Sequence, residues 1–284
     1  MTVPASAPAG GPSAGRSAGP VPSGPTLVRT DADGVATLRI NRPDALNALD
    51  TPTKVLFRDT LSEVARDPAV RCVVITGTGR AFCVGQDLRE HVTLQRRADP
   101  SLWRTVPDHF NPIAMTLAGM PKPVIAAING VTAGAGGSIA FAADLRIVAA
   151  SARFTTAFAG IALSADTGTS WWLPRLVGPT RAMELLLTGR TLDAQEALDL
   201  GIATEVVPDE KFQERVTEVA VMLAAGPTLA FASIRRAVAF SATHDLPTSL
   251  DHEARLMELT GASQDHAAAV AAFLAKAPPQ FQGR

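Results

Sequence analysis

Short apolar runs alternate with amphipathic segments through the middle of this chain. Val70–Thr76 (VRCVVIT), Pro123–Ile128 (PVIAAI) and Leu145–Ala149 (LRIVA) have the length and composition of buried strands. Thr51–Arg66 carries an apolar stripe at helical spacing, and a second helix is expected over Gly134–Ala143. Alternation of buried strands with helices predicts an α/β fold.

Turn residues predict how this domain opens. Leu27–Arg29 and Val35–Ile40 are strand-like and are separated by a segment that contains Asp33-Gly34. An Asp-Gly pair is a strong signal for a two-residue hairpin turn. A β-hairpin is therefore expected at the start of the folded region.

Helices are expected toward the C-terminus. Asp193 is placed to cap a short helix that Gly201 ends. Apolar residues at helical spacing predict a helix over Lys211–Ala225, and Leu250–Leu259 is a further candidate. We interpret these two segments as contributions to the core or to contacts between subunits.

Two glycine-bearing segments, about 50 residues apart, are the strongest chemical signal. GRAFCVGQDL (Gly79–Leu88) and NGVTAGAGGS (Asn129–Ser138) each follow an apolar run of strand type. Glycine allows close approach of the backbone to a ligand, and strand ends expose N–H groups. Two such donors on one carbonyl oxygen stabilise an enolate or a tetrahedral oxyanion, which indicates an enzyme that acts on acyl groups.

Composition narrows the class of protein. The chain has 284 residues, of which 46% are hydrophobic, and a formal net charge of −1. These values suit one sizeable domain with a full core. No basic run interleaved with aromatic residues suggests nucleic-acid binding, and charges or glycines break the apolar stretches before membrane-spanning length. We therefore expect neither a nucleic-acid partner nor a membrane.

The cysteines and the first 25 residues indicate the setting. Cys72 and Cys83 offer neither a disulfide framework nor metal-ligand spacing, so we expect a cytoplasmic protein without a metal. Residues 1–25 are almost entirely Ala, Gly, Pro and Ser, which predicts a disordered tail. Prolines interrupt any apolar run that a secretory signal would need.

Four motifs in order carry a family resemblance. NRPDALNAL (Asn41–Leu49), GRAFCVGQDL, AAINGVTAGAG (Ala126–Gly136) and LTGRTLDAQEALDLGIATEVVP (Leu187–Pro208) resemble the crotonase, or enoyl-CoA hydratase/isomerase, superfamily. The resemblance runs from about Thr26 to the C-terminus. It implies a spiral of ββα units over residues 26–205 and a C-terminal helical region over 206–284. That region is expected to assemble a homotrimer or hexamer and to form part of the CoA site.

The resemblance also implies a substrate and its contacts. The substrate is an acyl-CoA, with no other cofactor, and the two oxyanion donors are the backbone N–H groups of Gln86 and Ala135. Because only the main chain is required, the side chains at these positions are expected to matter little. The implied CoA contacts are Ala45, Arg80, Phe82, Val84, Phe273 and Lys276. Arg80 alternatively is an ordinary solvated arginine.

The catalytic carboxylates depart from the hydratase pattern. The two glutamates that hydratases use fall on Ser138 and Phe158, which cannot act as general acid or base in that way. Asp166 aligns instead with an acidic residue of the phenylacetate-pathway ring-epoxide and enoyl isomerases. A purely structural alternative is that Asp166 caps a helix that begins near Thr167. Ser138 and Ser164 lack the sequence context of a serine-hydrolase nucleophile.

Asp166 also matches the nucleophilic aspartate of 4-chlorobenzoyl-CoA dehalogenase. That enzyme needs a histidine and a tryptophan where this chain has Asn111 and Phe158. The GVTAGAG motif and the residues that follow Asp166 favour the isomerase branch. His109 is a secondary candidate for the acyl pocket.

With Asp166 as base, the expected reaction is a double-bond shift or a ring-epoxide rearrangement in fatty-acid or aromatic degradation. Apolar Ala157 and Phe158 would exclude water and so favour isomerisation over hydration. Two alternatives are a hydratase with an atypical base and a catalytically silent subunit that binds acyl-CoA. Exchange of the α-proton in heavy water separates the silent subunit from both enzymes.

Overall fold

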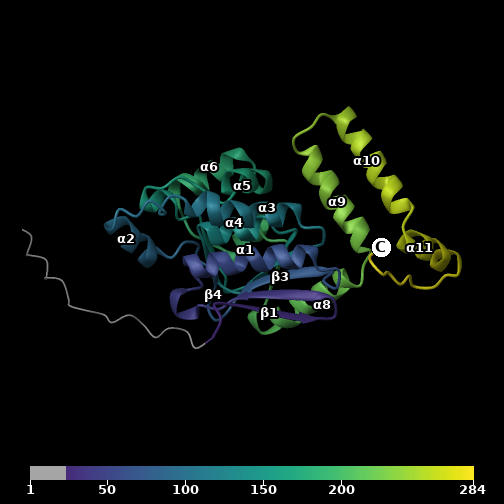
Figure 1. Ribbon diagram of the computed structural model, residues 1–284, viewed down its shortest axis with the longest axis horizontal. Helices are drawn as coiled ribbons and strands as arrows, with labels where there is room; N and C mark the ends of the chain where they lie inside the picture. The colour runs from purple at the N-terminus through teal and green to yellow at the C-terminus, as the bar shows by residue number, and fades with distance from the viewer. Residues whose placement is uncertain (1–23) are drawn as a thin grey trace, which may run out of the picture.

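The computed structural model describes residues 24–284 (Figure 1). Residues 1–23, which make up most of the expected disordered tail, lie outside the described residues. The strands are β1 (Leu27–Ala32), β2 (Val35–Ile40), β3 (Cys72–Gly77), β4 (Ala81–Cys83), β5 (Val124–Ile128), β6 (Val131–Ala133), β7 (Leu145–Ala149), β8 (Arg153–Thr155), β9 (Leu192–Asp193) and β10 (Glu205–Val207).

The long helices are α1 (Thr51–Arg66), α2 (Leu88–Arg96), α3 (Asn111–Gly119), α4 (Ala135–Phe141), α5 (Thr169–Val177), α6 (Pro179–Thr188), α7 (Ala194–Asp199), α8 (Phe212–Ala224), α9 (Thr228–Ser241), α10 (Leu246–Gly261) and α11 (Gln264–Leu274). Shorter turns are η1 (Pro43–Ala45), η2 (Val106–Phe110), η3 (Ala159–Ile161) and η4 (Asp209–Lys211). The helices predicted from spacing near residues 51, 134, 194, 212 and 250 are all present.

The predicted hairpin opens the described chain. Strands β1 and β2 pair antiparallel with Ala32 opposite Val35, which leaves Asp33 and Gly34 as the loop. Both loop residues have positive φ, 52° and 74°. A two-residue turn of this type needs positive φ at both positions, and Asp-Gly supplies it at low cost.

Successive strands go alternately to two sheets, and this alternation produces the spiral. The larger sheet has the order β1-β2-β3-β5-β7-β10 and the smaller has β4-β6-β8-β9. In the pairs β3–β4, β5–β6 and β7–β8, the first strand joins the larger sheet and the second joins the smaller one. Pairing is parallel from β2 to β10, because helices return the chain between strands. The structure thereby confirms the expected ββα fold.

Two apolar clusters cover the two faces of the larger sheet. The larger cluster joins Phe57 and Leu61 of α1 to Ile75 of β3, Ile113 of α3 and Ile139 of α4. The second cluster joins strand residues on the other face to α8. In Figure 1, α1 lies above the sheet and α8 below it. Helix α8 is thus part of the sheet-based body.

The boundary expected between the spiral (residues 26–205) and the C-terminal helical region (206–284) does not match this packing. It falls within β10 (Glu205–Val207), which pairs with β7, and it separates α8 from the sheet that α8 covers. The projecting helices begin with α9 (Figure 1). Apolar spacing alone could not show which surface α8 covers.

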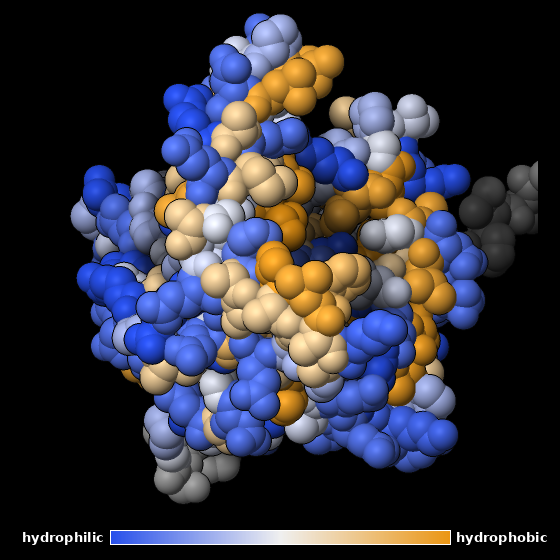
Figure 2. Space-filling model, turned by 90° about the vertical axis from the view of Figure 1, so that its right-hand side faces the viewer, coloured by the Kyte–Doolittle hydropathy of each residue, from blue (hydrophilic) through white to orange (hydrophobic). Residues whose placement is uncertain are grey.

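Helices α9, α10 and α11 project from the body and expose apolar side chains. Arg235 of α9 holds the base of the projection through Asp144 at 2.7 Å and the Leu117 carbonyl at 2.9 Å. Figure 2 shows hydrophobic side chains gathered on the face of the molecule that lies at the right of Figure 1. Apolar residues of the three helices with at least 45% exposure include Ile234, Val238, Leu246, Leu250, Met257, Leu259, Val270, Phe273 and Leu274.

Within residues 24–284, no single helix has both the length and the apolar character needed to cross a membrane. One pair of helices, bent by 98° between Asp209–Ala224 and Thr228–Ser241, would meet that requirement by length and composition alone.

Candidate active site

The two glycine-bearing segments lie side by side, because β4 and β6 are parallel neighbours in the smaller sheet. A Cβ atom on Gly85 would lie 2.9 Å from the backbone nitrogen of Ala135, and one on Gly136 would lie 2.1 Å from the carbonyl oxygen of Cys83. Side chains cannot be accommodated at such separations. Glycine at both positions therefore allows the end of β4 to touch the beginning of α4.

The backbone N–H of Gln86 faces away from the segment around Leu49, which pairs with it. Gln86 forms an isolated parallel bridge with Leu49. The Leu49 N–H donates to the Gly85 carbonyl at 2.7 Å, and the Asp87 N–H donates to the Leu49 carbonyl at 3.1 Å. Because N–H groups alternate in direction along an extended chain, the Gln86 N–H points to the opposite side. Among the described residues, no acceptor engages it.

Within residues 24–284, the N–H of Ala135 also has no acceptor, for a different reason. Ala135 is the first residue of α4, and the first N–H groups of a helix have no intrahelical acceptor. Gly134 precedes it with φ 50° and ψ −130°, a conformation that favours glycine. The site therefore presents two main-chain donors on adjoining segments, an arrangement that can bind one carbonyl oxygen.

Two asparagines hold the turn before β4. The side-chain amide of Asn47 donates to the carbonyls of Thr78 at 3.0 Å and Ala81 at 2.6 Å. Asn129 donates to the carbonyl of Gly79 at 2.8 Å. Sequence reasoning noted the motifs that contain these residues but missed their role. The available signal was an asparagine within each motif.

Asp166 is attached to α4 through its main chain. Its carbonyl accepts from the Thr169 N–H and hydroxyl, both at 2.9 Å, and from the Ser138 hydroxyl at 3.5 Å. Ser138 is also hydrogen-bonded to the Thr169 hydroxyl and is fully buried. Ser138 thus anchors the segment that carries Asp166, and it lies one helical turn after Ala135.

The capping alternative for Asp166 is wrong. Helix α5 begins at Thr169, two residues later than expected, and Gly168 occupies the N-cap position with no side-chain cap. The Asp166 carboxylate instead accepts a hydrogen bond of 2.8 Å from Thr167. Thr167 has φ 53°, an uncommon and costly conformation for a β-branched residue.

The environment of Asp166 favours a proton acceptor of increased basicity. Burial raises the pKa of Asp166, while the Thr167 hydrogen bond and the positive charge of Lys54 act in the opposite direction. The carboxylate remains partly exposed. A partly buried carboxylate with a raised pKa suits general base chemistry near neutral pH.

The side chain of Gln86 is engaged in hydrogen bonds, although the sequence indicated a role only for its main chain. Its Oε1 accepts a 2.9 Å hydrogen bond from Lys54, and its amide nitrogen lies 3.5 Å from Glu90. Lys54 also donates to Thr105 at 2.6 Å. Thr105 in turn contacts His109 at 3.3 Å, so the secondary candidate His109 lies in this polar cluster. Sequence reasoning missed Lys54, because lysine in an amphipathic helix is ordinarily solvated.

The expected CoA contacts divide into two groups within one chain. The first group includes Ala45 in η1 and Arg80, which follows Gly79; η1 and Gly79 are close, since a Cβ on Gly79 would be 3.4 Å from the Pro43 side chain. Arg80 is exposed, Val84 is half-buried, and Phe82 is fully buried in the larger core cluster. The surface near Ala45 thus offers an exposed guanidinium, whereas the Phe82 ring is packed in the core.

Phe273 and Lys276 form the second group, on the projecting helices. Phe273 is 81% exposed near the end of α11, and Lys276 follows that helix. Helix α11 lies far from α2 and α4 of the same chain (Figure 1). Within one chain, these residues do not meet the glycine-bearing segments.

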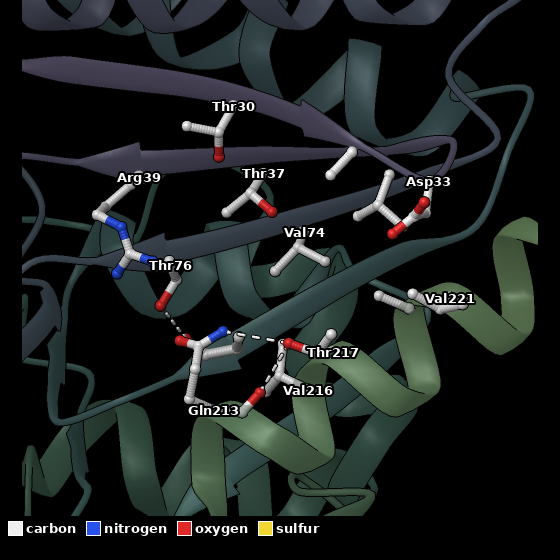
Figure 3. Close-up of a pocket in the computed structure, with 14 residues that line it drawn as sticks. Thr30, Asp33, Thr37, Arg39, Val74, Thr76, Gln213, Val216, Thr217 and Val221 are labelled. Atoms are coloured by element: carbon white, nitrogen blue, oxygen red, sulfur yellow. Dashed lines mark hydrogen bonds between the residues drawn. The ribbon is translucent and has the colours of Figure 1, made fainter.

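A groove of about 150 Å³ lies elsewhere, between α8 and the outer face of β1, β2 and β3 (Figure 3). Thr30, Thr37 and Thr76 point into it from the strands, and Gln213 and Thr217 from α8. Its lining includes none of the site residues expected from the sequence. The groove brings together no pair of groups suited to acid–base or nucleophilic catalysis.

Cysteine and metal chemistry have little support at the site. Cys72 and Cys83 are free and buried, and burial raises the pKa of each thiol to about 12. A thiol of that pKa is a poor nucleophile at neutral pH. In the part of the chain that the structure describes, no group of three or more His, Cys, Asp or Glu side chains is arranged to hold a metal ion.

Comparison with known proteins identifies the family. A model of the family described as enoyl-CoA hydratase/isomerase matches residues 30–284. The chain belongs to this family. It is therefore an enzyme of the enoyl-CoA hydratase/isomerase family with a CoA-thioester substrate.

Relatives of this enoyl-CoA hydratase/isomerase family member are named after different activities. The 1,2-epoxyphenylacetyl-CoA isomerase of Escherichia coli is 41% identical over 88% of this chain and 96% of its own length. A probable enoyl-CoA hydratase of Rhodobacter capsulatus is 40% identical over 89% and 96%. A 4-chlorobenzoyl coenzyme A dehalogenase of Arthrobacter sp. is 35% identical over 78% and 80%.

Solved structures of the family agree with the fold. A putative enoyl-CoA hydratase/isomerase from Mycobacterium abscessus has a TM-score of 0.87 and 42% identity, over 91% of this chain and all of its own. A putative enoyl-CoA hydratase from Streptomyces coelicolor has a TM-score of 0.88 and 36% identity, over 94% and 98%. Because one fold supports several reactions in this family, the reaction must be argued from the site.

Proposed function

We propose that this enzyme isomerises an acyl-CoA, by moving a double bond or by rearranging a ring epoxide, with Asp166 as the base. The observation that carries this proposal is the position of Asp166. Its main chain is bonded to α4 one turn from the free Ala135 N–H, while Ser138 and Phe158 occupy the positions that resemble the hydratase glutamates. The likeness to an epoxyphenylacetyl-CoA isomerase supports the same reaction class.

The chemistry follows from these groups. The N–H groups of Gln86 and Ala135 would donate to the thioester oxygen and stabilise the negative charge that it gains. Asp166 would take a proton from a carbon conjugated to that carbonyl, which leaves an enolate. Return of the same proton to a different carbon would complete the shift, with no other cofactor needed. Buried Phe158 would limit access of water and so disfavour hydration.

Hydration of an enoyl-CoA is the second candidate, because a relative of similar identity is called a probable hydratase. Mass spectrometry of the products from aliphatic and aromatic enoyl-CoAs and a ring-epoxide CoA separates the candidates. Isomerisation leaves the mass unchanged, hydration adds one water, and the panel also identifies the acyl class.

The proposed location is the cytoplasm, supported by the two free thiols and testable by cell fractionation.

Ala135→Pro should decrease kcat by about 100-fold or more, because it removes one oxyanion donor. Proline is tolerated at the first position of a helix, so the fold should survive. Ala135→Ser keeps the N–H and is the matched control. Steady-state kinetics and circular dichroism measure the result, and equal turnover by the two folded variants would contradict the assignment of this amide.

Asp166→Asn should decrease isomerisation and proton exchange by about 100-fold or more while CoA-thioester affinity changes little. Asp193→Asn is the control, since Asp193 caps α7 far from the reaction and asparagine caps equally well. In the wild type, activity should fall as the pH falls through the raised pKa of Asp166, because only the ionised carboxylate accepts a proton. Near-normal turnover by Asp166→Asn would place the base elsewhere.

Arg80→Ala should raise KM for CoA thioesters with little change in kcat, because the exposed guanidinium is proposed to bind the CoA nucleotide. Ala45 and Val84 would border the same region, whereas the expected contact of Phe82 is not supported, because its ring is fully buried in the core. Pantetheine thioesters, which lack the nucleotide, provide the comparison. An equal rise in KM for both substrate types would show that Arg80 acts in some other way.

Light scattering should find three or six chains per particle. The apolar surface of α9, α10 and α11 is large for a single chain (Figure 2), and burial of such surface favours association. Assembly would also bring Phe273 and Lys276 of one chain toward the CoA site of its neighbour. A monodisperse monomer at micromolar concentration would refute both ideas.

A further inference from the structure

Lys54 is a buried cation that the proposed reaction leaves unexplained. It lies in the first turns of α1 and has 0% exposure. Lysine is seldom fully buried unless its charge is paired. A cation near the N-terminal end of a helix is also opposed by the helix dipole. Helix stability therefore does not account for a lysine at this position, and its buried charge is paired with Glu90 of α2 at 3.6 Å.

Its ammonium group is directed at the site. Lys54 Nζ donates to Gln86 Oε1 at 2.9 Å and to Thr105 Oγ1 at 2.6 Å. It lies 3.6 Å from Glu90 Oε2 and 5.4 Å from the centre of the Phe110 ring. Glu90 is held separately by the backbone N–H of Thr51, at 3.0 Å. The ammonium thus fixes the side chain of the residue whose main-chain N–H faces the site.

Charged groups surround Lys54 on each element packed against it. Burial lowers the pKa of Lys54, and Glu90, Asp50 and Asp87 oppose that effect. On η2, burial and the charges of Lys54 and Arg58 lower the pKa of His109. The anions Glu90, Asp50 and Asp87 lie on the side of α1 and α2. On the side of α5, the positive charge of Lys54 acts to lower the pKa of the Asp166 carboxyl.

We propose that Lys54 is a positioning residue for the isomerase reaction: it orients Gln86 as oxyanion donor and supplies a buried positive charge that favours both the enolate and an ionised Asp166. This inference rests on the proposed function. It concerns a side chain that acts through Gln86 and through the local field, without touching the substrate. Placing a positive charge in a water-poor site strengthens its effect on nearby anions.

Lys122 provides a matched comparison, because it is a second buried lysine that contacts α1, at the opposite end of the helix. It is 4% exposed and donates to the carbonyls of Val64 and Asp67 at 2.8 Å each. These carbonyls lie at the C-terminal end of α1, where a cation is favoured. Val64 is ten residues from Lys54, which is about 15 Å along a helix. Lys122 is therefore a structural buried lysine remote from the site.

The test compares Lys54→Met with Lys122→Met in the full-length enzyme. Lys54→Met should decrease kcat/KM by about 10-fold or more and shift the acid limb of its pH profile upward by about one unit, because Asp166 loses a neighbouring positive charge. Any alkaline limb that reports loss of the Lys54 proton should disappear. Lys122→Met should change thermal stability but neither limb.

Infrared spectroscopy of bound phenylacetyl-CoA supplies a second reading that does not need Asp166. A thioester carbonyl polarised by the oxyanion donors absorbs at lower frequency than the free thioester. Lys54→Met should return this band toward the free value, and Lys122→Met should not. If Asp166→Asn proved fully active, the proposed base would fail while the infrared comparison still tested Lys54.

Lys54→Arg keeps the charge and guards against a Lys54→Met protein that does not fold. It should retain the acid limb and the carbonyl frequency, and its alkaline limb should move beyond the measurable range, because arginine stays protonated. The proposal is overturned by unchanged pH limbs and carbonyl frequency in folded Lys54→Met. It is equally overturned if Lys122→Met produces the same changes, or if Lys54→Met loses activity with neither reading shifted.

Discussion

The close approach of two backbone segments is the constraint on which the site depends. The end of β4 and the start of α4 touch at Gly85 and Gly136, where a single added carbon would collide with main-chain atoms at 2.9 Å and 2.1 Å. This contact brings Gln86 and Ala135 onto adjoining segments. It exists because consecutive ββα units place β4 and β6 side by side. The fold thus places on adjoining segments two main-chain N–H groups that have no acceptor within residues 24–284.

The acidic chemistry is attached to the same framework. Ser138, in the position that resembles a hydratase glutamate, has become a buried hydroxyl that binds the main chain at Asp166. The hydrogen bonds of Ser138 and Thr169 hold the main chain at Asp166. Thr167, in a strained backbone conformation, holds the carboxylate through its hydroxyl. One small network therefore connects Ser138 of α4 with the segment that carries the Asp166 carboxylate.

The two faces of the larger sheet differ in what covers them: α8 covers one face, and α1, which carries Lys54, covers the other. One face is closed by α8, and the groove beside it is lined mainly by threonines and aliphatic residues. The other face carries α1, whose first turns deliver Lys54 to Gln86 while its last turn is capped by Lys122. A buried lysine thus lies at each end of α1: Lys54 belongs to the helix, whereas Lys122 comes from the segment between α3 and β5. The projecting helices contribute to neither face and expose apolar side chains.

Local sequence determined much of this protein. Asp33-Gly34 specified the hairpin turn, Asp50 and Asp193 capped α1 and α7, and apolar runs located the strands of the larger sheet. Such features depend on residues close together in the chain, so they can be read without the fold. The four motifs carried the family, and through it the spiral and the expected site. Short strands such as β4 and β8 gave little periodic signal of their own.

Only the tertiary structure decided which polar residues meet. Lys54, Gln86 and Asp166 are far apart in sequence, and nothing in the helical spacing around Lys54 distinguishes it from a solvated lysine. The same holds for Ser138 and Thr169, for the covering of the sheet by α8, and for the start of α5 after Asp166. Burial, charge interaction and hydrogen bonding between distant segments depend on distances that exist only after the chain has folded.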